Sequence, residues 1–147
     1  MLDYKIEILK GVSSEDLSDI SGLLYQLDSS IQKLSKGVLK KTIETRGIYV
    51  FVARNTDGKI IGTLTLVSYW YLEGYEKAWI EDVVVDKNCR GQGIGKNLIK
   101  VALEKAKKEK IKIISLTSSP TRKEANFLYI KMGFEKRDTN CYRYKFD

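Results

Sequence analysis

Three glycines stand at every second position in the segment CRGQGIGKNL (89–98), which joins two apolar stretches of the chain. The preceding run AWIEDVVV (78–85) contains three consecutive valines, which favour a strand that is buried on both faces. The residues that follow, to about 110, repeat apolar side chains at helical spacing. A buried strand that enters a helix through a glycine-rich turn predicts a mixed α/β domain in which a ligand can approach bare backbone.

The surroundings of this loop favour a phosphate group as that ligand. The first N–H groups of a helix have no partner within the helix, and the helix dipole attracts anions to them. Arg90 and Lys96 would add positive charge. Two nucleotide motifs are excluded, because G-x-G-x-G is not the dinucleotide spacing and because Asn97 stands where a Walker A loop needs Ser or Thr.

The rest of the chain predicts alternating strands and helices. Ser13 can cap the first helix, Asp57-Gly58 indicates a two-residue hairpin turn, and Thr121 with Glu124 indicates a capping box. No repeat or linker interrupts the chain, so we expect one mixed α/β (α+β) domain over residues 1–147. The strands are expected at 4–9, 48–55, 59–71, 78–85, 111–117 and in FEKR and CYRYKF near the end, and the helices at 13–30, 34–45, 94–110 and 120–132.

The composition limits which catalytic and metal-binding groups the chain can use. The chain has 147 residues and no histidine, which removes the commonest general base and most zinc sites, so no metal site is expected. Cys89 and Cys141 have no metal-binding spacing, and without histidine neither matches an activated nucleophile. The N-terminus lacks a signal-peptide pattern and no apolar run is long enough to span a membrane, which predicts a cytoplasmic protein without a membrane partner.

The net charge of +7 is concentrated in the C-terminal part of the chain. Residues 1–85 carry 10 Lys and Arg against 12 Asp and Glu, whereas residues 86–147 carry 16 against 7. This distribution suits a polyanionic small molecule or a nucleic acid. Because no helix-turn-helix, zinc or RNP motif is present, nucleic acid is the less favoured partner.

Two segments resemble a known family. VVVDKNCRGQGIGKNLI is similar to the acetyl-CoA motif of the GCN5-related N-acetyltransferase (GNAT) superfamily, [R/Q]-x-x-G-x-[G/A], which Arg90, Gly93 and Gly95 match. EANFLYIKMGF resembles the closing motif of the same superfamily, A-x-x-L-Y-x-x-x-G-F. Together they cover 78–137, whereas the first 77 residues follow only the element order.

This resemblance implies a mostly antiparallel mixed sheet, with a parallel, splayed pair of strands (78–85 and 111–117) and about four flanking helices. It implies an acetyl-CoA-dependent N-acetyltransferase without a metal, in which a primary amine attacks the thioester directly in a ternary complex. Many members are dimers, so it also implies a homodimer. The residues implied to bind acetyl-CoA are Val83, Val84 and Val85 along the pantetheine arm, and Arg90, Gly91, Gln92, Gly93, Ile94, Gly95 and Lys96 at the pyrophosphate.

The closing motif supplies the expected acid. The resemblance makes Tyr129 the group that protonates the departing thiolate. Asn126 and Arg122 share its helix face at i−3 and i−7, so Asn126 is expected to reach the same cofactor. Many members have Asn where this chain has Arg122, whose role is therefore open between a CoA phosphate and solvent.

The base is less clearly defined. Many members place a glutamate twelve residues before the tyrosine, where this chain has Thr117. Glu81 and Asp82 are the alternatives, and strand alternation allows only one of them to face the substrate. We choose Glu81, acting through water, because IEDVVVD resembles the corresponding stretch of glucosamine-6-phosphate acetyltransferases.

The acceptor stays open among polyamines, amino sugars, aminoglycosides, protein N-termini and lysines. A non-catalytic acyl-CoA sensor and a nucleic-acid-binding protein are the other classes considered. One cluster of aromatic residues either lines the amine site or belongs to an ordinary half-buried sheet surface: Tyr69, Trp70, Tyr71, Tyr75 and Trp79.

Overall fold

The computed structural model describes all 147 residues, and their contacts divide the chain into two compact units, Met1–Thr117 and Ser118–Asp147. The second unit contains one helix, α4 (Lys123–Lys131). The first unit contains β1 (Tyr4–Ile8), α1 (Ser14–Leu27), α2 (Lys36–Glu44), β2 (Ile48–Asn55), β3 (Ile60–Tyr71), β4 (Tyr75–Val85), a short 3-10 helix (Lys87–Cys89), α3 (Ile94–Lys108) and β5 (Ile113–Ser115).

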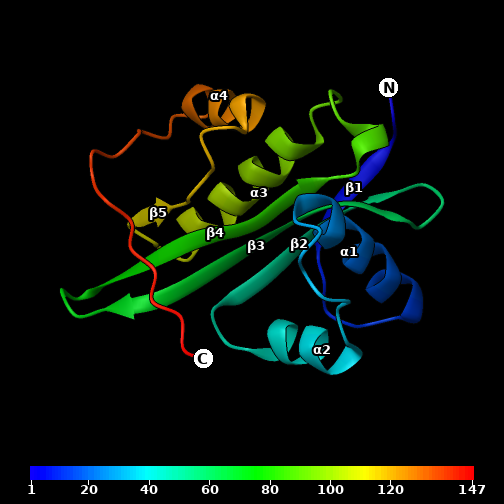
Figure 1. The fold of residues 1–147 in the computed structure, drawn as a ribbon, viewed down its shortest axis with the longest axis horizontal. Helices are drawn as coiled ribbons and strands as arrows, with labels where there is room; N and C mark the ends of the chain where they lie inside the picture. The colour runs from blue at the N-terminus through cyan, green and yellow to red at the C-terminus, as the bar shows by residue number, and fades with distance from the viewer. The chain divides into compact units, whose positions relative to one another are not determined.

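The strands form one mixed sheet in the order β1-β2-β3-β4-β5 (Figure 1). Each of the first three pairs is antiparallel, and β4 pairs with β5 in parallel. Four α-helices accompany this sheet in the chain. The mixed, mostly antiparallel sheet expected from the sequence is therefore confirmed.

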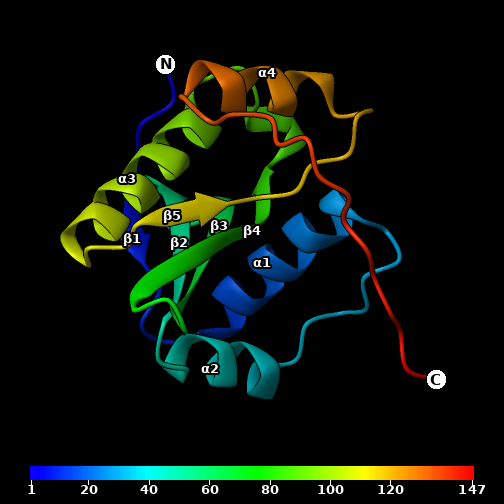
Figure 2. The ribbon, with the colours of Figure 1, turned by 90° about the vertical axis from the view of Figure 1, so that its left-hand side faces the viewer.

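Helices cover both faces of this sheet, as Figure 2 shows from the side. On one face, Leu23 of α1 and Leu39 of α2 belong to a core with Val50, Val52 and Val84. On the other face α3 lies so close to β3 that a Cβ added at Gly62 would stand 3.2 Å from the side chains of Ile94 and Leu98. The glycine at position 62 thus permits the close packing of α3 on the sheet.

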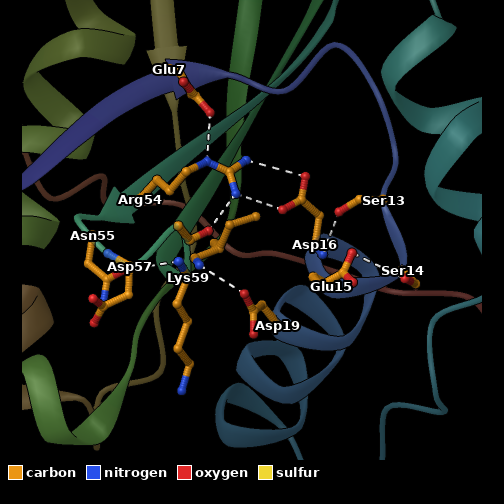
Figure 3. Close-up of polar contacts among 12 residues, drawn as sticks. Glu7, Ser13, Ser14, Glu15, Asp16, Asp19, Arg54, Asn55, Asp57 and Lys59 are labelled. Carbon is orange, nitrogen blue, oxygen red and sulfur yellow. Dashed lines mark hydrogen bonds and ion pairs between the residues drawn. The ribbon is translucent and has the colours of Figure 1, made fainter.

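The start of α1 agrees with the sequence and is held by a polar network. The hydroxyl of Ser13 accepts a hydrogen bond from the Asp16 N–H at 3.0 Å, as expected of an N-cap. Figure 3 shows Arg54 bonded to Asp16 (2.7 Å) and Glu7 (2.8 Å). Arg54 also donates to the Gly58 carbonyl (2.7 Å). These bonds raise the pKa of Arg54, with Asp16 as the main cause, and they connect β1, α1 and the β2–β3 turn.

The β2–β3 turn differs from the expected two-residue hairpin. Four residues, 56–59, separate the strands. The Asn55 side-chain oxygen accepts hydrogen bonds from the N–H groups of Asp57 (3.1 Å) and Lys59 (2.9 Å). Gly58 nevertheless has a positive φ of +84°, as glycine often does in a hairpin turn. The side chain of Asn55 therefore organises a longer turn than Asp57-Gly58 alone would give.

The C-terminal part differs from expectation in four ways. β5 is three residues long, and α4 begins at Lys123 with Arg122 as its N-cap and no side-chain cap. The Thr121 hydroxyl bonds the Ser119 hydroxyl at 2.9 Å, so the expected capping box with Glu124 does not form. The expected strands in FEKR and CYRYKF are also absent, since no segment pairs with residues 134–147. A strand needs such a neighbour for its backbone hydrogen bonds.

Candidate functional site

The parallel pair of strands separates part of the way along β4. Residues 77–79 of β4 pair with 113–115 of β5, and the pairing ends at Trp79 although β4 continues to Val85. The splayed parallel pair expected from the sequence is thus present. The C-terminal half of β4 lies beyond its β5 neighbour and runs directly into the glycine loop.

A β-bulge lies in this half of β4. Thr65 of β3 pairs with Glu81 and Thr63 pairs with Val84, so Asp82 and the next residue oppose a single residue of β3. Asp82 has φ +51°, in the left-handed region that Asp tolerates better than most residues. The regular alternation of faces therefore ends directly after Glu81. Bulges of this kind occur often beside active sites.

The register identifies the face of the sheet to which Glu81 belongs. Thr65 pairs with both Val50 and Glu81, so these three share one face. Val50 belongs to the core under α1 and α2, and Glu81 itself is exposed. Partial desolvation and then the charge of Asp82 raise the pKa of Glu81, which makes its carboxylate a better base. Desolvation also raises the pKa of Asp82.

The glycine loop has the geometry of an anion cradle. Gly91 and Gly93 have φ values of +76° and +79°, and a Cβ at either position would meet no atom within 4 Å. Gly93 is the N-cap of α3, and no side chain caps this helix. The first N–H groups of α3 therefore have no capping side chain and lie beside bare glycine backbone, an arrangement that suits a phosphate group.

The other predicted loop residues either anchor the loop or remain exposed. Ile94 is 1% exposed and fixes the start of α3 in the core. Arg90 Nε donates to the Val85 carbonyl at 3.1 Å, and the Gln92 side chain accepts the Leu2 N–H at 3.1 Å. Lys96 is exposed in the first turn of α3. Arg90 and Lys96 are thus exposed cations of the loop, and their contact with an anion stays a prediction.

Asp86 and Gln26 hold the entrance of the loop, and the sequence interpretation missed both. Asp86 accepts the Asn88 N–H (2.9 Å) and the Gln26 side-chain amide (3.3 Å), while Gln26 accepts the Lys87 N–H (2.9 Å). The Asn88 N–H is the main cause that lowers the pKa of Asp86. An Asp-x-Asn sequence after a strand suggests such a turn, but nothing in the sequence indicates Gln26 as its partner.

The second unit contains Tyr129, the residue for which the sequence predicts the role of acid. Tyr129 is buried, and its ring packs edge-on against Phe134 with centroids 6.0 Å apart. Burial raises the pKa of its phenol, an effect that the Arg122 charge opposes. The Asn126 side-chain amide donates to the carbonyls of Ser119 and Arg122, both at 2.8 Å. Asn126 therefore holds the start of α4, and its own carbonyl oxygen is the group that remains for a cofactor.

The aromatic residues of the β3–β4 hairpin form two contacts. Tyr71 and Tyr75 lie 5.5 Å apart, with Lys77 Nζ 3.6 Å from the Tyr71 ring centre. Trp79 Nε1 donates to the Tyr69 hydroxyl at 3.4 Å. Trp70 lies on the opposite face and is 72% exposed. Four of the five predicted aromatic residues thus share one face of the hairpin.

The helices carry no segment that is both long enough and apolar enough to cross a membrane.

Comparison with known proteins gives consistent results. The Acetyltransferase (GNAT) family model matches residues 20–134. A Bacillus subtilis N-acetyltransferase, YhdJ, is 31% identical over 117 residues, covering 79% of this chain and 73% of its own. The acetyltransferase structure from Trypanosoma brucei has 30% identity and a TM-score of 0.80, covering 97% of this chain and all of its own.

Two further relatives extend this comparison. The N-acetyltransferase MJ1207 of Methanocaldococcus jannaschii is 29% identical over 142 residues, which are 91% of this chain. The match spans 63% of the length of that relative. The aminoalkylphosphonate N-acetyltransferase of Salmonella typhimurium is 24% identical over 134 residues, covering 87% of this chain and 84% of its own. With its splayed strands and glycine cradle, the chain belongs to the GNAT family of acetyltransferases, which are acyltransferase enzymes.

Proposed function

We propose that this protein transfers the acetyl group of acetyl-CoA to a primary amine within a ternary complex. The observation that carries the proposal is the glycine cradle at the start of α3, which has no side-chain cap and open space at Gly91 and Gly93. It follows a strand that has already separated from its parallel neighbour. An extended phosphate-bearing ligand suits this combination.

The cradle and the end of β4 would hold acetyl-CoA. The backbone from Gly91 to Lys96, including Gln92, Ile94 and Gly95, would face the pyrophosphate, and Arg90 would add charge. The backbone of Val83 to Val85 would run beside the pantetheine arm, and Asn126 would offer its carbonyl oxygen. Acetyl-CoA supplies the thioester carbonyl that the amine attacks.

Glu81 and Tyr129 would handle the protons. Glu81, with its raised pKa, would take a proton from the incoming ammonium through a water molecule. Tyr129, whose pKa is raised by burial, stays protonated at neutral pH and would give its proton to the sulfur. A C–N bond forms and a C–S bond breaks, so the products are an amide and free CoA. The family match crosses from the first unit into the second, which supports residues 1–147 acting as one domain.

Thermal unfolding with and without acetyl-CoA, followed by thiol release on the same sample, tests this proposal. We expect acetyl-CoA to raise the unfolding temperature and at least one primary amine to release free CoA. A thermal shift without thiol release from any amine would instead support an acyl-CoA sensor. No thermal shift would contradict the assignment of the cradle.

A further inference from the structure

We infer that Tyr4 and Asn97 are positioning residues for acetyl-CoA, because they tie the glycine loop to the first strand of the sheet. This inference rests on the proposed function, in that it takes the cradle at the start of α3 as the pyrophosphate site. It adds to that site the N-terminal segment, residues 2–4, which lies outside both motifs that resemble the GNAT superfamily. All of these residues belong to the first unit.

The part of the loop that would face the phosphates needs support from other segments. Gly91 and Gly93 adopt positive φ, and glycine loses more conformational freedom on ordering than any other residue. Gly93 begins α3 as an N-cap without a side-chain hydrogen bond. The bonds made by Asp86 and Arg90 hold the chain before Gly91. The stretch that begins at Gly91 therefore depends on different contacts.

The N-terminal segment supplies such contacts at two points. The Leu2 N–H donates to the side-chain oxygen of Gln92 at 3.1 Å, and Gln92 stands between the two glycines. The Asn97 side-chain amide donates to the Tyr4 hydroxyl at 2.6 Å. The Asn97 N–H also donates to the Gly93 carbonyl at 3.0 Å, which closes the first turn of α3. The N-terminal segment thus holds the chain on each side of Gly93.

The sheet explains why Tyr4 reaches α3. Tyr4 is the half-buried first residue of β1, and it shares a face with Ile6, two residues further along the strand. Ile6 pairs with Ala53, which pairs with Gly62. Gly62 is the residue of β3 that packs closely against α3. The Tyr4 hydroxyl therefore projects from a paired strand toward α3 and is a fixed anchor for the loop.

Such an anchor strengthens ligand binding by preorganisation. A site that is correctly ordered in only a fraction of the molecules binds its ligand with an affinity reduced by that fraction. The Tyr4–Asn97 bond is exposed to solvent, so its net contribution is that of an ordinary hydrogen bond. Its loss should weaken acetyl-CoA binding about 2–10-fold and leave the reacting groups in place.

Calorimetric titration with acetyl-CoA tests the inference. Tyr4→Phe keeps the ring and removes the hydroxyl, so Kd should rise about 2–10-fold. Asn97→Ala should raise Kd equally without lowering the unfolding temperature, because alanine is the better helix former at this exposed position. The double variant should lose no more affinity than either single variant, since both remove the same bond. In the thiol-release assay KM for acetyl-CoA should rise by the same factor, with kcat unchanged.

Tyr75→Phe is the matched control. It removes another exposed tyrosine hydrogen bond, to Glu73 at 2.8 Å, at the end of β4 opposite the glycine loop, and should keep the wild-type Kd. A wild-type Kd in Tyr4→Phe, or additive losses in the double variant, would overturn this inference and leave the proposed function intact. Binding of acetyl-CoA without thiol release from any amine would overturn the proposed function alone, and no binding to the wild type would overturn both.

Discussion

Gly93 meets a backbone requirement, and the proposed function adds a ligand requirement at the same position. Its φ of +79° lies in the left-handed region, and the space where a Cβ would point is open. Gly93→Ala should cost about 1–2 kcal/mol of folding free energy. The new methyl group would also stand beside the bound pyrophosphate, so we expect acetyl-CoA to bind about 10–100-fold more weakly, the equivalent of one lost charged hydrogen bond. Calorimetric titration with acetyl-CoA measures this change.

Gly58→Ala is the control that separates the loss of stability from the loss of acetyl-CoA affinity. Gly58 has φ +84° and equally open space, but it lies in the β2–β3 turn. We expect this variant to lose similar stability and to keep its affinity for acetyl-CoA. If the two variants lose affinity equally, the cradle is not the phosphate site.

The raised pKa of Glu81 predicts how activity depends on pH. Its pKa is raised, so kcat/KM should fall as pH drops through a value above the usual 4.3 or so of glutamate. Glu81→Gln should lower kcat about 10²-fold and remove this dependence. Because the charge of Asp82 contributes to the shift, Asp82→Asn should move the same limb of the pH profile to lower pH. An unchanged profile in Glu81→Gln would assign the base elsewhere.

Tyr129→Phe removes the proposed acid and little else. The phenyl ring keeps the edge-on contact with Phe134, so folding should be preserved. We expect kcat to fall about 10–100-fold with no change in acetyl-CoA affinity. The exposed Tyr142→Phe is the control and should leave kcat unchanged. Equal kcat in the wild type and Tyr129→Phe would show that water protonates the thiolate.

At the scale of elements, the contact between α3 and β3 sets a steric limit. A Cβ at Gly62 would lie 3.2 Å from Ile94 and Leu98 and 3.4 Å from the Val84 carbonyl. Gly62→Ala should therefore destabilise the fold by about 1–3 kcal/mol, as overpacking does. Gly22→Ala in α1, where nothing lies within 4 Å of the added methyl group, should stabilise by about 0.5–1 kcal/mol. Urea unfolding of both variants measures the opposite signs, and a stabilised Gly62→Ala would refute the contact.

The elements that the sequence predicted well are those with local determinants. Ser13 caps α1 through its own side chain, and the glycine loop adopts positive φ at Gly91 and Gly93. The C-terminal strands failed because a strand depends on a neighbour that its own residues do not specify. The β2–β3 turn was wrong because the side chain of Asn55, outside the two expected turn residues, sets its length.

In the candidate site, too, the parts set by local sequence were predictable and the parts set by distant neighbours were not. Its cradle and its tyrosine stand in contiguous motifs that the sequence displays. The bulge at Asp82 arises from the register between β3 and β4, and the Gln26–Asp86 bond joins residues 60 apart in the chain. Neither arrangement follows from local propensity, since each depends on which strand or helix becomes the neighbour.

At the scale of the whole molecule, carboxylates with lowered pKa connect segments that are distant in sequence. Hydrogen bonds from Lys5 and then Arg54 lower the pKa of Glu7, which ties β1 to β2. At the entrance of the glycine loop the Asn88 N–H is the main cause that lowers the pKa of Asp86, and the distant Gln26 side chain donates to the same carboxylate. The folded state therefore binds fewer protons at these two positions than the unfolded chain does.

The sign of the pH dependence of stability follows from this difference. The contribution of Glu7 and Asp86 is fully present above their unfolded pKa values, about 4, and is lost as pH falls through the lower folded values. Glu81 and Asp82 act in the opposite direction, because their raised pKa values favour protonation in the folded state. We expect Glu7→Gln with Asp86→Asn to be less stable than the wild type at pH near 7 and to lose less free energy between about pH 5 and 2. Urea unfolding across this range measures both quantities, with Glu104→Gln as the control that keeps the wild-type slope. A double variant with an unchanged slope would show that other carboxylates dominate the acid transition.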